Sequence, residues 1–488
     1  MSVEPECPVL WTAEEAAAAT SGRSAASWRA TGVSIDSRTV AAGDLFVALQ
    51  GPNFDGHDFV ARALAAGAAA ALVTHRPEGV DETAPLLQVE DSFAALQDLG
   101  RVARLRTKAR VIAVTGSVGK TGTKEALVKC LAAQAPSYAT AGSLNNHWGV
   151  PLSLARLPAD CRFGVFELGM NHAGEIGPLS QQVRPDAGII TTIEPAHLEF
   201  FSSLEAIADA KAELFEGMAS DGVAILNRDN GQFGRLLAAA RTRGLQRIWS
   251  FGRDERADAR LLDCSSHATC SVVNAQICGE RIHYCVSLPG KHWVMNSLAV
   301  LLAVKAAGAD IHAAARTLGQ LTPVKGRGTR QRIRLKQGAF TLIDESYNAS
   351  PAAMDAAFSV LAATDPGAGG RRIAVLGDMR ELGVRSDSLH AALAEPLIAA
   401  GIDLVFCCGP HMSKLFQRLP PTLRGCHTED SAALAEVVAR TARSGDVVLV
   451  KGSAGSRMGA VVAALSALDR NGDGASADPT AARAAAAH

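Results

Sequence analysis

Val111-Ile112-Ala113-Val114-Thr115-Gly116-Ser117-Val118-Gly119-Lys120-Thr121 is the stretch around which we expect the chain to be organised. Its first four residues are apolar and mostly β-branched, which predicts a buried strand. Two glycines then predict a tight turn. After Thr121, apolar residues recur at helical spacing through Ala126, Leu127, Cys130 and Leu131. The stretch therefore predicts a strand, a glycine-rich loop and a helix.

That order is typical of a phosphate-binding loop. Glycines let the backbone approach a triphosphate, and the unpaired N–H groups of the helix start point at the anion. Lys120 can neutralise phosphate oxygens, and the Thr121 hydroxyl can hold Mg²⁺. The usual G-x-x-x-x-G-K-[ST] pattern has glycine where this chain has Val114, so the alternative is a strand-to-helix turn with an exposed lysine. We predict nucleotide binding at this loop.

The composition excludes several classes of protein. The 488 residues include 48 Lys and Arg against 49 Asp and Glu, so no basic field suggests a nucleic-acid partner. The ten cysteines include no C-x-x-C pair, which favours buried reduced thiols over a zinc site. The first residues, MSVEPECPVLW, do not resemble a signal peptide, and no apolar run of about 18 residues could span a bilayer. We expect a cytoplasmic protein without membrane insertion.

A chain of this length needs several hydrophobic cores, and its patterns predict an α/β fold of three domains. Strands alternating with helices indicate parallel sheets. We predict an N-terminal α/β domain at 1–108, a central parallel-sheet ATPase domain with the phosphate loop at 109–324 and a C-terminal Rossmann-like domain at 325–468. A disordered tail would follow at 469–488. Residues 101–110 are interpreted as a basic linker, and residues 252–290 as a small antiparallel insert.

Several polar residues follow predicted strands of the central domain. Glu167, His197 and Asn227 each come after such a strand, as the phosphate loop does. Ligands collect at the carboxyl ends of parallel strands, so these residues are expected to lie together. Beside a triphosphate Glu167 is a natural Mg²⁺ ligand. Taken singly, Glu167 could be a surface acid and His197 an ordinary loop histidine.

Lys211 lies in a predicted helix over 204–218, for which Ser202 and Glu205 form a possible capping box. It shares a face with Ala208 and Phe215, so its side chain is expected to point into the protein. An ordinary surface lysine is the alternative. An ammonium would be repelled by Mg²⁺ unless it were carbamylated to an anion.

Outside the central domain, Asp344 and Glu345 follow a predicted strand and suit ribose hydroxyls, or else form a polar turn. Arg327 lies at the second domain boundary, where it could contact a phosphate or belong to a flexible hinge. In the N-terminal domain, Ser37 and Arg38 could hold a phosphate or a uracil ring, although a solvated turn is the simpler interpretation.

Many ordered motifs between about residues 30 and 465 together resemble the Mur ligase family, and within it the MurF type. The stretches that carry the resemblance are Asp36-Ser37-Arg38, Gly43-Asp44-Leu45-Phe46, Asp55-Gly56-His57, Thr115-Gly116-Ser117-Val118-Gly119-Lys120-Thr121, Asn145-Asn146, Glu167-Leu168-Gly169-Met170-Asn171, Ala196-His197-Leu198-Glu199, Lys211, His292 with Asn296, Tyr347-Asn348-Ala349, Gly377-Asp378-Met379 and Val450-Lys451-Gly452-Ser453. The diamino-acid block Asp-Asn-Pro-Arg of MurE-type ligases is absent from the sequence.

The resemblance implies ATP-dependent ligation of D-alanyl-D-alanine to UDP-N-acetylmuramoyl-tripeptide through an acyl phosphate. Lys120, His197 and Lys211 would be catalytic. Thr121, Glu167, His197 and a carbamylated Lys211 would hold Mg²⁺, with two ions expected. ATP would contact Thr115, Gly116, Ser117, Val118, Gly119, Lys120, Thr121, Asn227, Asn296, Arg327, Asp344 and Glu345, and the UDP-linked substrate Ser37, Arg38, Asn145 and Asn146. We expect a monomer.

The chain departs from the family pattern at a few positions. Trp293 replaces the Asn that usually follows His292, Glu345 replaces an Asp, and Ser350 replaces an Asn before Pro351. Two other functions remain open: a different Mur-superfamily amino-acid ligase, of the MurE or folylpolyglutamate type, and a nucleotide-gated switch without ligase activity.

Overall fold

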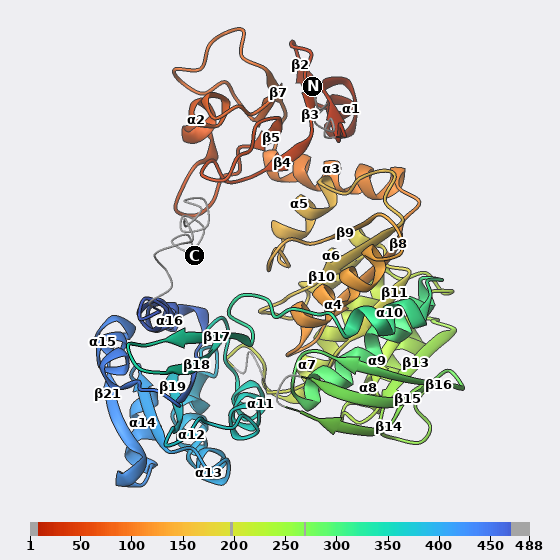
Figure 1. Cartoon of the computed structure of the whole chain (residues 1–488). Helices are drawn as coiled ribbons and strands as arrows, with labels where there is room; N and C mark the ends of the chain where they lie inside the picture. The colour runs from red at the N-terminus through yellow and green to blue at the C-terminus, as the bar shows by residue number, and fades with distance from the viewer. Residues whose placement is uncertain (1–7, 196–198, 268–269, 470–488) are drawn as a thin grey trace, which may run out of the picture.

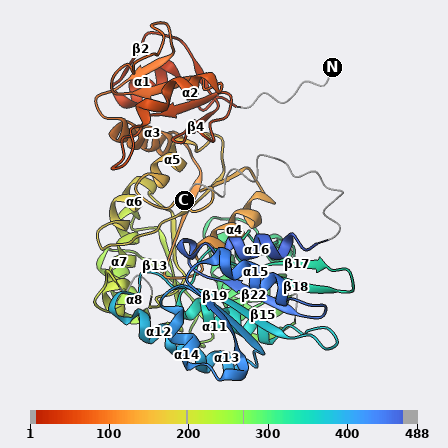
Figure 2. The same cartoon turned by 90° about the vertical axis from the view of Figure 1, so that its left-hand side faces the viewer.

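The computed structural model describes residues 8–195, 199–267 and 270–469. Three large sheets, each formed within one segment of the chain, and a small two-stranded sheet build an α/β protein of three parts (Figure 1). The part that holds the nine-stranded sheet lies between the other two along the chain, and the N-terminal part projects from one end of the molecule (Figures 1 and 2). The boundaries at 108/109 and 324/325 remain predictions.

The N-terminal part contains a five-stranded sheet in the order β2-β7-β6-β5-β4, parallel except for the β2–β7 pair. Its strands are β2 (Arg23–Ser24), β4 (Gly32–Ser34), β5 (Asp44–Val47), β6 (Ala70–Val73) and β7 (Leu86–Gln88), and β1 (Trp11–Thr12) pairs separately with β3 (Arg29–Ala30). Its helices are α1 (Ala13–Thr20), the 3-10 turn η1 (Gly56–Phe59), α2 (Val60–Ala65) and α3 (Ser92–Arg106).

The predicted linker at 101–110 is wrong. Helix α3 continues to Arg106, and β8 already begins at Arg110. Leu96, Leu99 and Ala103 are buried at helical spacing, while the basic residues occupy the other faces of the helix. Arg104 donates to the carbonyls of Val183 and Arg184, so it fastens the helix end to the central part.

The central sheet has nine strands in the order β16-β15-β14-β13-β12-β11-β8-β10-β9. They are β8 (Arg110–Thr115), β9 (Ser137–Ala139), β10 (Phe163–Glu167), β11 (Ala187–Ile190), β12 (Val223–Asn227), β13 (Arg247–Gly252), β14 (Ala259–Ser266), β15 (Ser271–Ile277) and β16 (Glu280–Val286). Only the β14–β15 and β15–β16 pairs are antiparallel. The antiparallel pairing predicted at 252–290 is thus confirmed, but these strands extend the main sheet because β14 pairs in parallel with β13.

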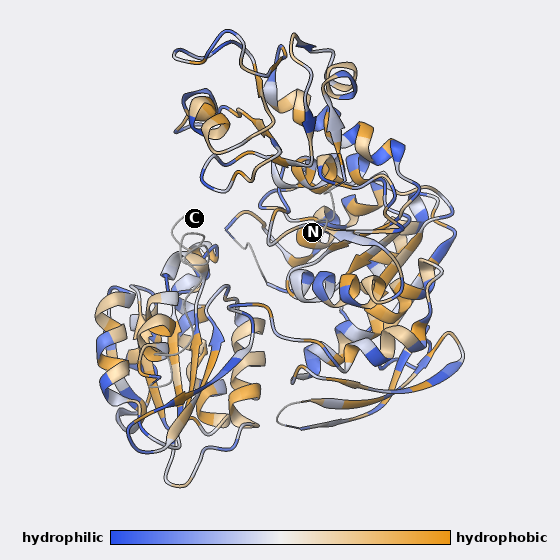
Figure 3. Cartoon of the chain, turned by 45° about the horizontal axis from the view of Figure 1, so that its top comes forward, coloured by the Kyte–Doolittle hydropathy of each residue, from blue (hydrophilic) through white to orange (hydrophobic). Residues whose placement is uncertain are grey.

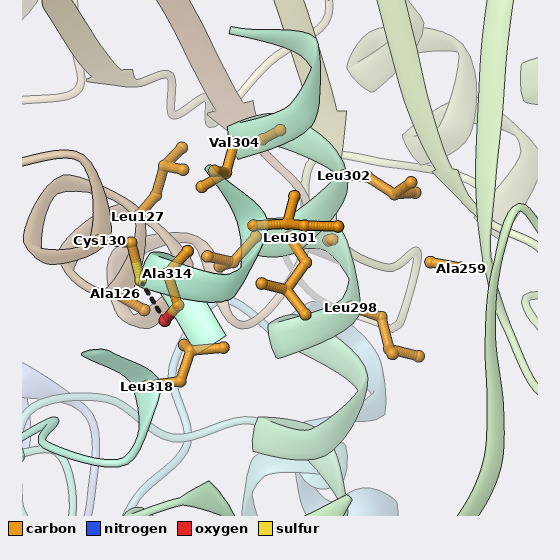
Figure 4. Packing of buried hydrophobic residues seen from close by; sticks show 14 of the residues in the cluster. Ala126, Leu127, Cys130, Ala259, Leu298, Leu301, Leu302, Val304, Ala314 and Leu318 are labelled. Atoms are coloured by element: carbon orange, nitrogen blue, oxygen red, sulfur yellow. Dashed lines mark hydrogen bonds between the residues drawn. The ribbon is translucent and has the colours of Figure 1, made fainter. Parts of the chain in front are cut away.

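Helices cover both faces of this sheet. They are α4 (Lys120–Ala132), α5 (Gly149–Ala155), α6 (Ile176–Val183), α7 (Leu204–Ala212) with the 3-10 turn η2 (Glu213–Gly217), α8 (Phe233–Thr242), α9 (Lys291–Ala306) and α10 (Ile311–Leu318). α4, α9 and α10 form one core, in which Leu127 and Cys130 pack beside Leu301 and Ala314 (Figure 4). α5 to α8 cover the other face. Because both faces are buried, the parallel strands are mainly apolar, with polar residues chiefly at their ends (Figure 3).

The C-terminal part is a six-stranded sheet in the order β17-β18-β22-β19-β20-β21, parallel except for the β17–β18 pair. Its strands are β17 (Thr329–Arg334), β18 (Ala339–Glu345), β19 (Arg372–Gly377), β20 (Leu404–Cys408), β21 (Arg424–Thr428) and β22 (Val447–Lys451). The helices are α11 (Pro351–Ala362), η3 (Gly383–Arg385), α12 (Ser386–Ala392), α13 (Ala394–Ala399), α14 (Met412–Arg418), η4 (Pro421–Leu423), α15 (Ser431–Thr441), η5 (Ala454–Ser456) and α16 (Gly459–Ser466). In the described part of the chain, no helix combines the length and the apolar character needed to cross a membrane.

Candidate active site

The phosphate loop has the predicted strand–loop–helix form, from the end of β8 at Thr115 to the start of α4 at Lys120. Gly116 has φ +141° and Gly119 has φ +87°, a region that side chains disfavour. Space is equally restrictive: a Cβ at Gly116 would lie 2.1 Å from Thr191 Oγ1, and one at Gly119 would lie 2.9 Å from Asn296 Nδ2. Both glycines are therefore required by the loop.

Lys120 lies over this loop. Its Nζ donates to the carbonyl oxygens of Gly116 at 2.8 Å and of Ser117 at 3.3 Å. Burial lowers the pKa of this amine, while the nearby Glu167 carboxylate acts in the opposite direction. The ammonium is held where the first turn of α4 leaves its N–H groups unpaired, so charge and backbone donors converge on one position.

Glu167 ends β10 beside the loop and is only 1% exposed. One of its oxygens, Oε1, accepts a hydrogen bond of 2.7 Å from Asn145 Nδ2. The other, Oε2, is buried and has no hydrogen-bond partner among the described residues. A buried carboxylate oxygen without a donor is costly, and it fits the oxygen coordination that Mg²⁺ requires.

Lys211 is fully buried on α7, as the shared face with Ala208 predicts. Its helix is capped by Ser203, which accepts from the N–H of Ala206, so the prediction of a cap at Ser202 is wrong by one residue. Lys211 Nζ has no hydrogen-bond partner within the described ranges. Burial holds the pKa of this amine well below its usual value, and the Lys120 ammonium lowers it further. Such an amine is poised to be neutral.

His197 falls between the described ranges 8–195 and 199–267, so its predicted roles in catalysis and metal binding lie outside the described residues. They remain predictions.

A cleft of about 900 Å³ joins the phosphate loop and Glu167 to the C-terminal part, and Lys211 is not among its lining residues. From the central part it is lined by loop residues 117–121, by Asn145, Asn146 and Glu167 and by Asn227 and Asn296. The C-terminal part contributes Arg327, Glu345, Tyr347 and Lys451. The structure thus brings together most residues predicted to bind ATP. Thr115, Gly116 and Asp344 are not in its lining: Thr115 donates to the carbonyl of Leu168, and Asp344 accepts from the N–H of Ser346.

The C-terminal side of the cleft is organised by two cations. The guanidinium of Arg327 lies 4.3 Å from the ring centre of Tyr347, a cation–π contact. Tyr347 in turn donates from its hydroxyl to Ser143 Oγ at 2.7 Å, across to the central part. Lys451 is 3.1 Å from Glu345, an ion pair that holds the Glu345 carboxylate in the cleft wall.

The two asparagines predicted to bind the UDP-linked substrate already have internal partners. Asn145 orients Glu167, and the Asn146 side-chain oxygen accepts from the N–H of Gly149 at 2.9 Å, at the start of α5. Ser37 and Arg38 are not among the cleft residues. Arg38 pairs with Asp36 at 2.7 Å and is more than half exposed.

Lys124 was not predicted as part of the site. It is fully buried on α4, and its Nζ donates to the carbonyls of Thr140 at 2.7 Å and Gly142 at 3.0 Å. It thereby fixes the segment that leads to Asn145. The sequence gives little indication that Lys124 is buried, because a lysine four residues after Lys120 in a helix is normally solvated.

Comparisons with known proteins agree with this geometry. Three Mur ligase family models match the chain: the catalytic domain at 29–114, the middle domain at 114–304 and the glutamate ligase domain at 330–454. The chain is 37% identical to the UDP-N-acetylmuramoyl-tripeptide--D-alanyl-D-alanine ligase of Escherichia coli, over 89% of this chain and 93% of that protein.

Two solved structures are also similar. MurF from Acinetobacter baumannii matches with a TM-score of 0.81 at 31% identity, covering 94% of this chain and 99% of that one. MurF from Thermotoga maritima, solved in complex with ADP, matches with a TM-score of 0.73 at 28% identity, covering 90% and 97%. The chain belongs to the Mur ligase family, among its MurF-type members.

Proposed function

We propose that this chain joins D-alanyl-D-alanine to UDP-N-acetylmuramoyl-tripeptide with the hydrolysis of ATP to ADP and phosphate, giving the pentapeptide precursor of peptidoglycan. The observation that carries the proposal is the shared cleft. The phosphate loop, the free oxygen of Glu167 and the cations of the C-terminal part all belong to it. These are the groups that phosphoryl transfer to a carboxylate requires.

ATP would lie with its phosphates on residues 115–121 and Lys120 beside them. Asn227 and Asn296 line the same side of the cleft, and Arg327 and Glu345 face it from the C-terminal part. Asp344 supports this wall through its bonds to Ser346. Arg327 belongs to the C-terminal part, so it can contact a phosphate on the central part only when these two parts meet. ATP binding would therefore favour the arrangement in which the central and C-terminal parts are in contact.

Mg²⁺ would be held by Glu167 and Thr121, with His197 and Lys211 as further members of the predicted set. When bound, the ions neutralise phosphate charge. Lys211 fits this set only as an anion. Its neutral Nζ would attack CO₂ and release a proton, which replaces an unpartnered amine by a carboxylate with two oxygens. The buried Nζ of Lys211, which has no hydrogen-bond partner among the described residues, is the observation that supports the carbamate.

The chemistry then follows from charge. A carboxylate oxygen of the tripeptide attacks the γ-phosphorus, and ADP leaves. The two reactants repel each other by about 1 kcal/mol at 4 Å in water and several-fold more in a dry site. Lys120 and the loop N–H groups offset this repulsion. The dipeptide amine next attacks the carbonyl carbon of the acyl phosphate, and phosphate leaves with the former carboxylate oxygen.

Ser37 and Arg38 would bind the uridine diphosphate end of the substrate. They lie outside the cleft, so an extended UDP-linked peptide would have to reach from the N-terminal part to Glu167. Asn145 and Asn146 line the cleft and would lie on that route. We also propose that one chain acts alone in the cytoplasm, since the cleft is formed within a single copy.

The test is a reaction of the purified chain with ATP, Mg²⁺, the UDP-linked tripeptide and D-alanyl-D-alanine. We expect one amide product and one phosphate per ATP, both dependent on the dipeptide. Meso-diaminopimelate, L-lysine and L-glutamate serve as competing amines. An amide with one of these instead would identify a MurE- or folylpolyglutamate-type ligase, and ATP binding without any amide would identify a nucleotide-gated switch.

A further inference from the structure

Trp293 is the most conspicuous departure from the family pattern that the proposed chemistry does not use. It lies in the first turn of α9, is half-buried and lines the cleft beside the phosphate loop. Part of the indole packs against the hydrophobic core of the central part, and its exposed remainder leaves apolar surface in water unless a flat ligand covers it.

The space for this indole is provided by Gly122, in the first turn of α4. A Cβ built on Gly122 would lie 2.7 Å from Cη2 of Trp293 and 3.3 Å from both Cζ2 and Cζ3. A real Cβ essentially never lies at the shorter distance, so a side chain at position 122 would force the indole to shift, and we treat the two residues as a matched pair. Gly122 is helical and has no positive φ, so the conformation of the backbone does not call for glycine there. The close approach of the indole is what favours glycine at this position.

The pair is next to the place where a nucleotide must bind. Gly122 directly follows Thr121 of the phosphate loop, and Asn296, in the same turn of α9 as Trp293, lies against Gly119. A nucleotide whose phosphates occupy the loop therefore meets the first turn of α9.

Other aromatic rings of the cleft are already engaged. Tyr347 is covered by Arg327 and donates to Ser143, and His147 packs edge-on against Phe93. Among the described residues, the indole of Trp293 has one aromatic neighbour, His292. The centres of the two rings are 5.9 Å apart. Among the described residues that line the cleft, Trp293 presents the largest aromatic ring.

We propose that Trp293 is a specificity-determining residue that stacks on the base of ATP, and that Gly122 admits the indole to that position. The proposal rests on the nucleotide site proposed above and adds the residue that recognises the base. Stacking needs only a flat π-face, so the pair selects nucleotides over bare polyphosphates and discriminates weakly between purines.

The test compares Mg-ATP with Mg-tripolyphosphate, which has the same charged chain but no base, by calorimetric titration. The variants are Trp293→Ala, Trp293→Phe, Gly122→Ala and the double variant. Gly234→Ala is the matched control, because a Cβ at this glycine of α8 would meet nothing within 4 Å.

We expect Trp293→Ala to bind ATP about tenfold more weakly, the usual range for one stacked base, with tripolyphosphate unchanged. Trp293→Phe should restore most of the loss. Gly122→Ala should weaken ATP binding by displacing the indole, and the double variant should be no worse than Trp293→Ala, because both changes act through one contact. Gly234→Ala should match the wild type.

Unchanged ATP affinity in Trp293→Ala would overturn the stacking role, as would an equal loss for tripolyphosphate. Additive losses in the double variant would overturn the matched pair. A wild-type chain that binds neither ligand would overturn the nucleotide site itself, a result distinct from the loss of stacking alone.

Discussion

Lys211 is an unusual lysine because its amine is buried and its pKa is lowered. It is fully buried without a hydrogen-bond partner in the described part of the chain, and burial beside Lys120 depresses the pKa of its amine. The unfolded chain therefore binds a proton that the folded chain resists, at every pH between the depressed pKa and about 10.4. In that window folding stability rises with pH.

The expected consequence is that Lys211→Met stabilises the protein in CO₂-free buffer at pH 7. A gain of 1 kcal/mol raises Tm by about 2 to 4 °C for a domain of this size, and the gain should shrink as pH approaches 10. Thermal unfolding of both proteins from pH 6 to 10 provides the check. A gain that grows with pH would contradict the depressed pKa.

Lys120 and Lys129 offer a matched comparison on one helix. Lys120 lies over the phosphate loop, whereas Lys129 is exposed in the last turn of α4 and donates to Thr322. Lys120→Met should lower kcat by about 10²- to 10³-fold, the usual effect of removing one preorganised charge donor. Lys129→Met should leave turnover near wild type. Equal kcat for the two variants, measured by phosphate release, would remove Lys120 from the mechanism.

Single residues were predictable where a local rule governs them. Thr12 and Glu15 have the spacing of a capping box, and the structure contains that box with both of its hydrogen bonds. The burial of Lys211 followed from its face of α7. Lys124 was not predictable, because its partners at 140 and 142 come from another element.

Helix α4 is the element that ties the nucleotide loop to the substrate segment. Its start carries Lys120, and one turn later Lys124 fastens the carbonyls of Thr140 and Gly142. The segment then continues to Asn145, which orients Glu167. One helix thus supports the loop and, through two hydrogen-bond steps, the carboxylate opposite it.

Lys124→Met should therefore cost about 1 to 3 kcal/mol, since it leaves the buried carbonyl of Thr140 without a donor. The loss should appear as a lower Tm, and amide hydrogen exchange should quicken in residues 140–146 while β8 stays protected. Uniform acceleration throughout the central sheet would instead assign Lys124 to global stability alone.

Element prediction succeeded where buried strands are continuous apolar runs. The mainly apolar runs at 340–343, 373–376, 404–407 and 447–450 predict four strands of the C-terminal part, and the structure contains all four. The edge strands β17 and β21 escaped notice, because Thr329–Arg334 and Arg424–Thr428 are rich in polar and basic residues. The end of α3 was mistaken for a linker for the same reason.

At the scale of the whole molecule, the α/β class and the three-part organisation were predictable, but the cleft was not. Its sides are joined by a few polar contacts between distant segments, such as Tyr347 with Ser143 and the N–H of Glu199 with the carbonyl of Glu381. Hydrophobic periodicity predicts helices and strands, but it does not predict such contacts between distant segments. Family resemblance supplied the expectation that these parts meet, and the geometry shows which side chains do so.

The central claim concerns bond-making in that cleft: the tripeptide carboxylate takes the γ-phosphoryl group before the amine attacks. The most direct test is whether an oxygen atom moves from the tripeptide carboxylate to the released phosphate. The UDP-linked tripeptide is prepared with ¹⁸O in its terminal carboxylate, and the released phosphate is analysed by mass spectrometry. An acyl phosphate predicts one labelled oxygen in each phosphate formed with the amide. Amide formation with unlabelled phosphate would contradict the account.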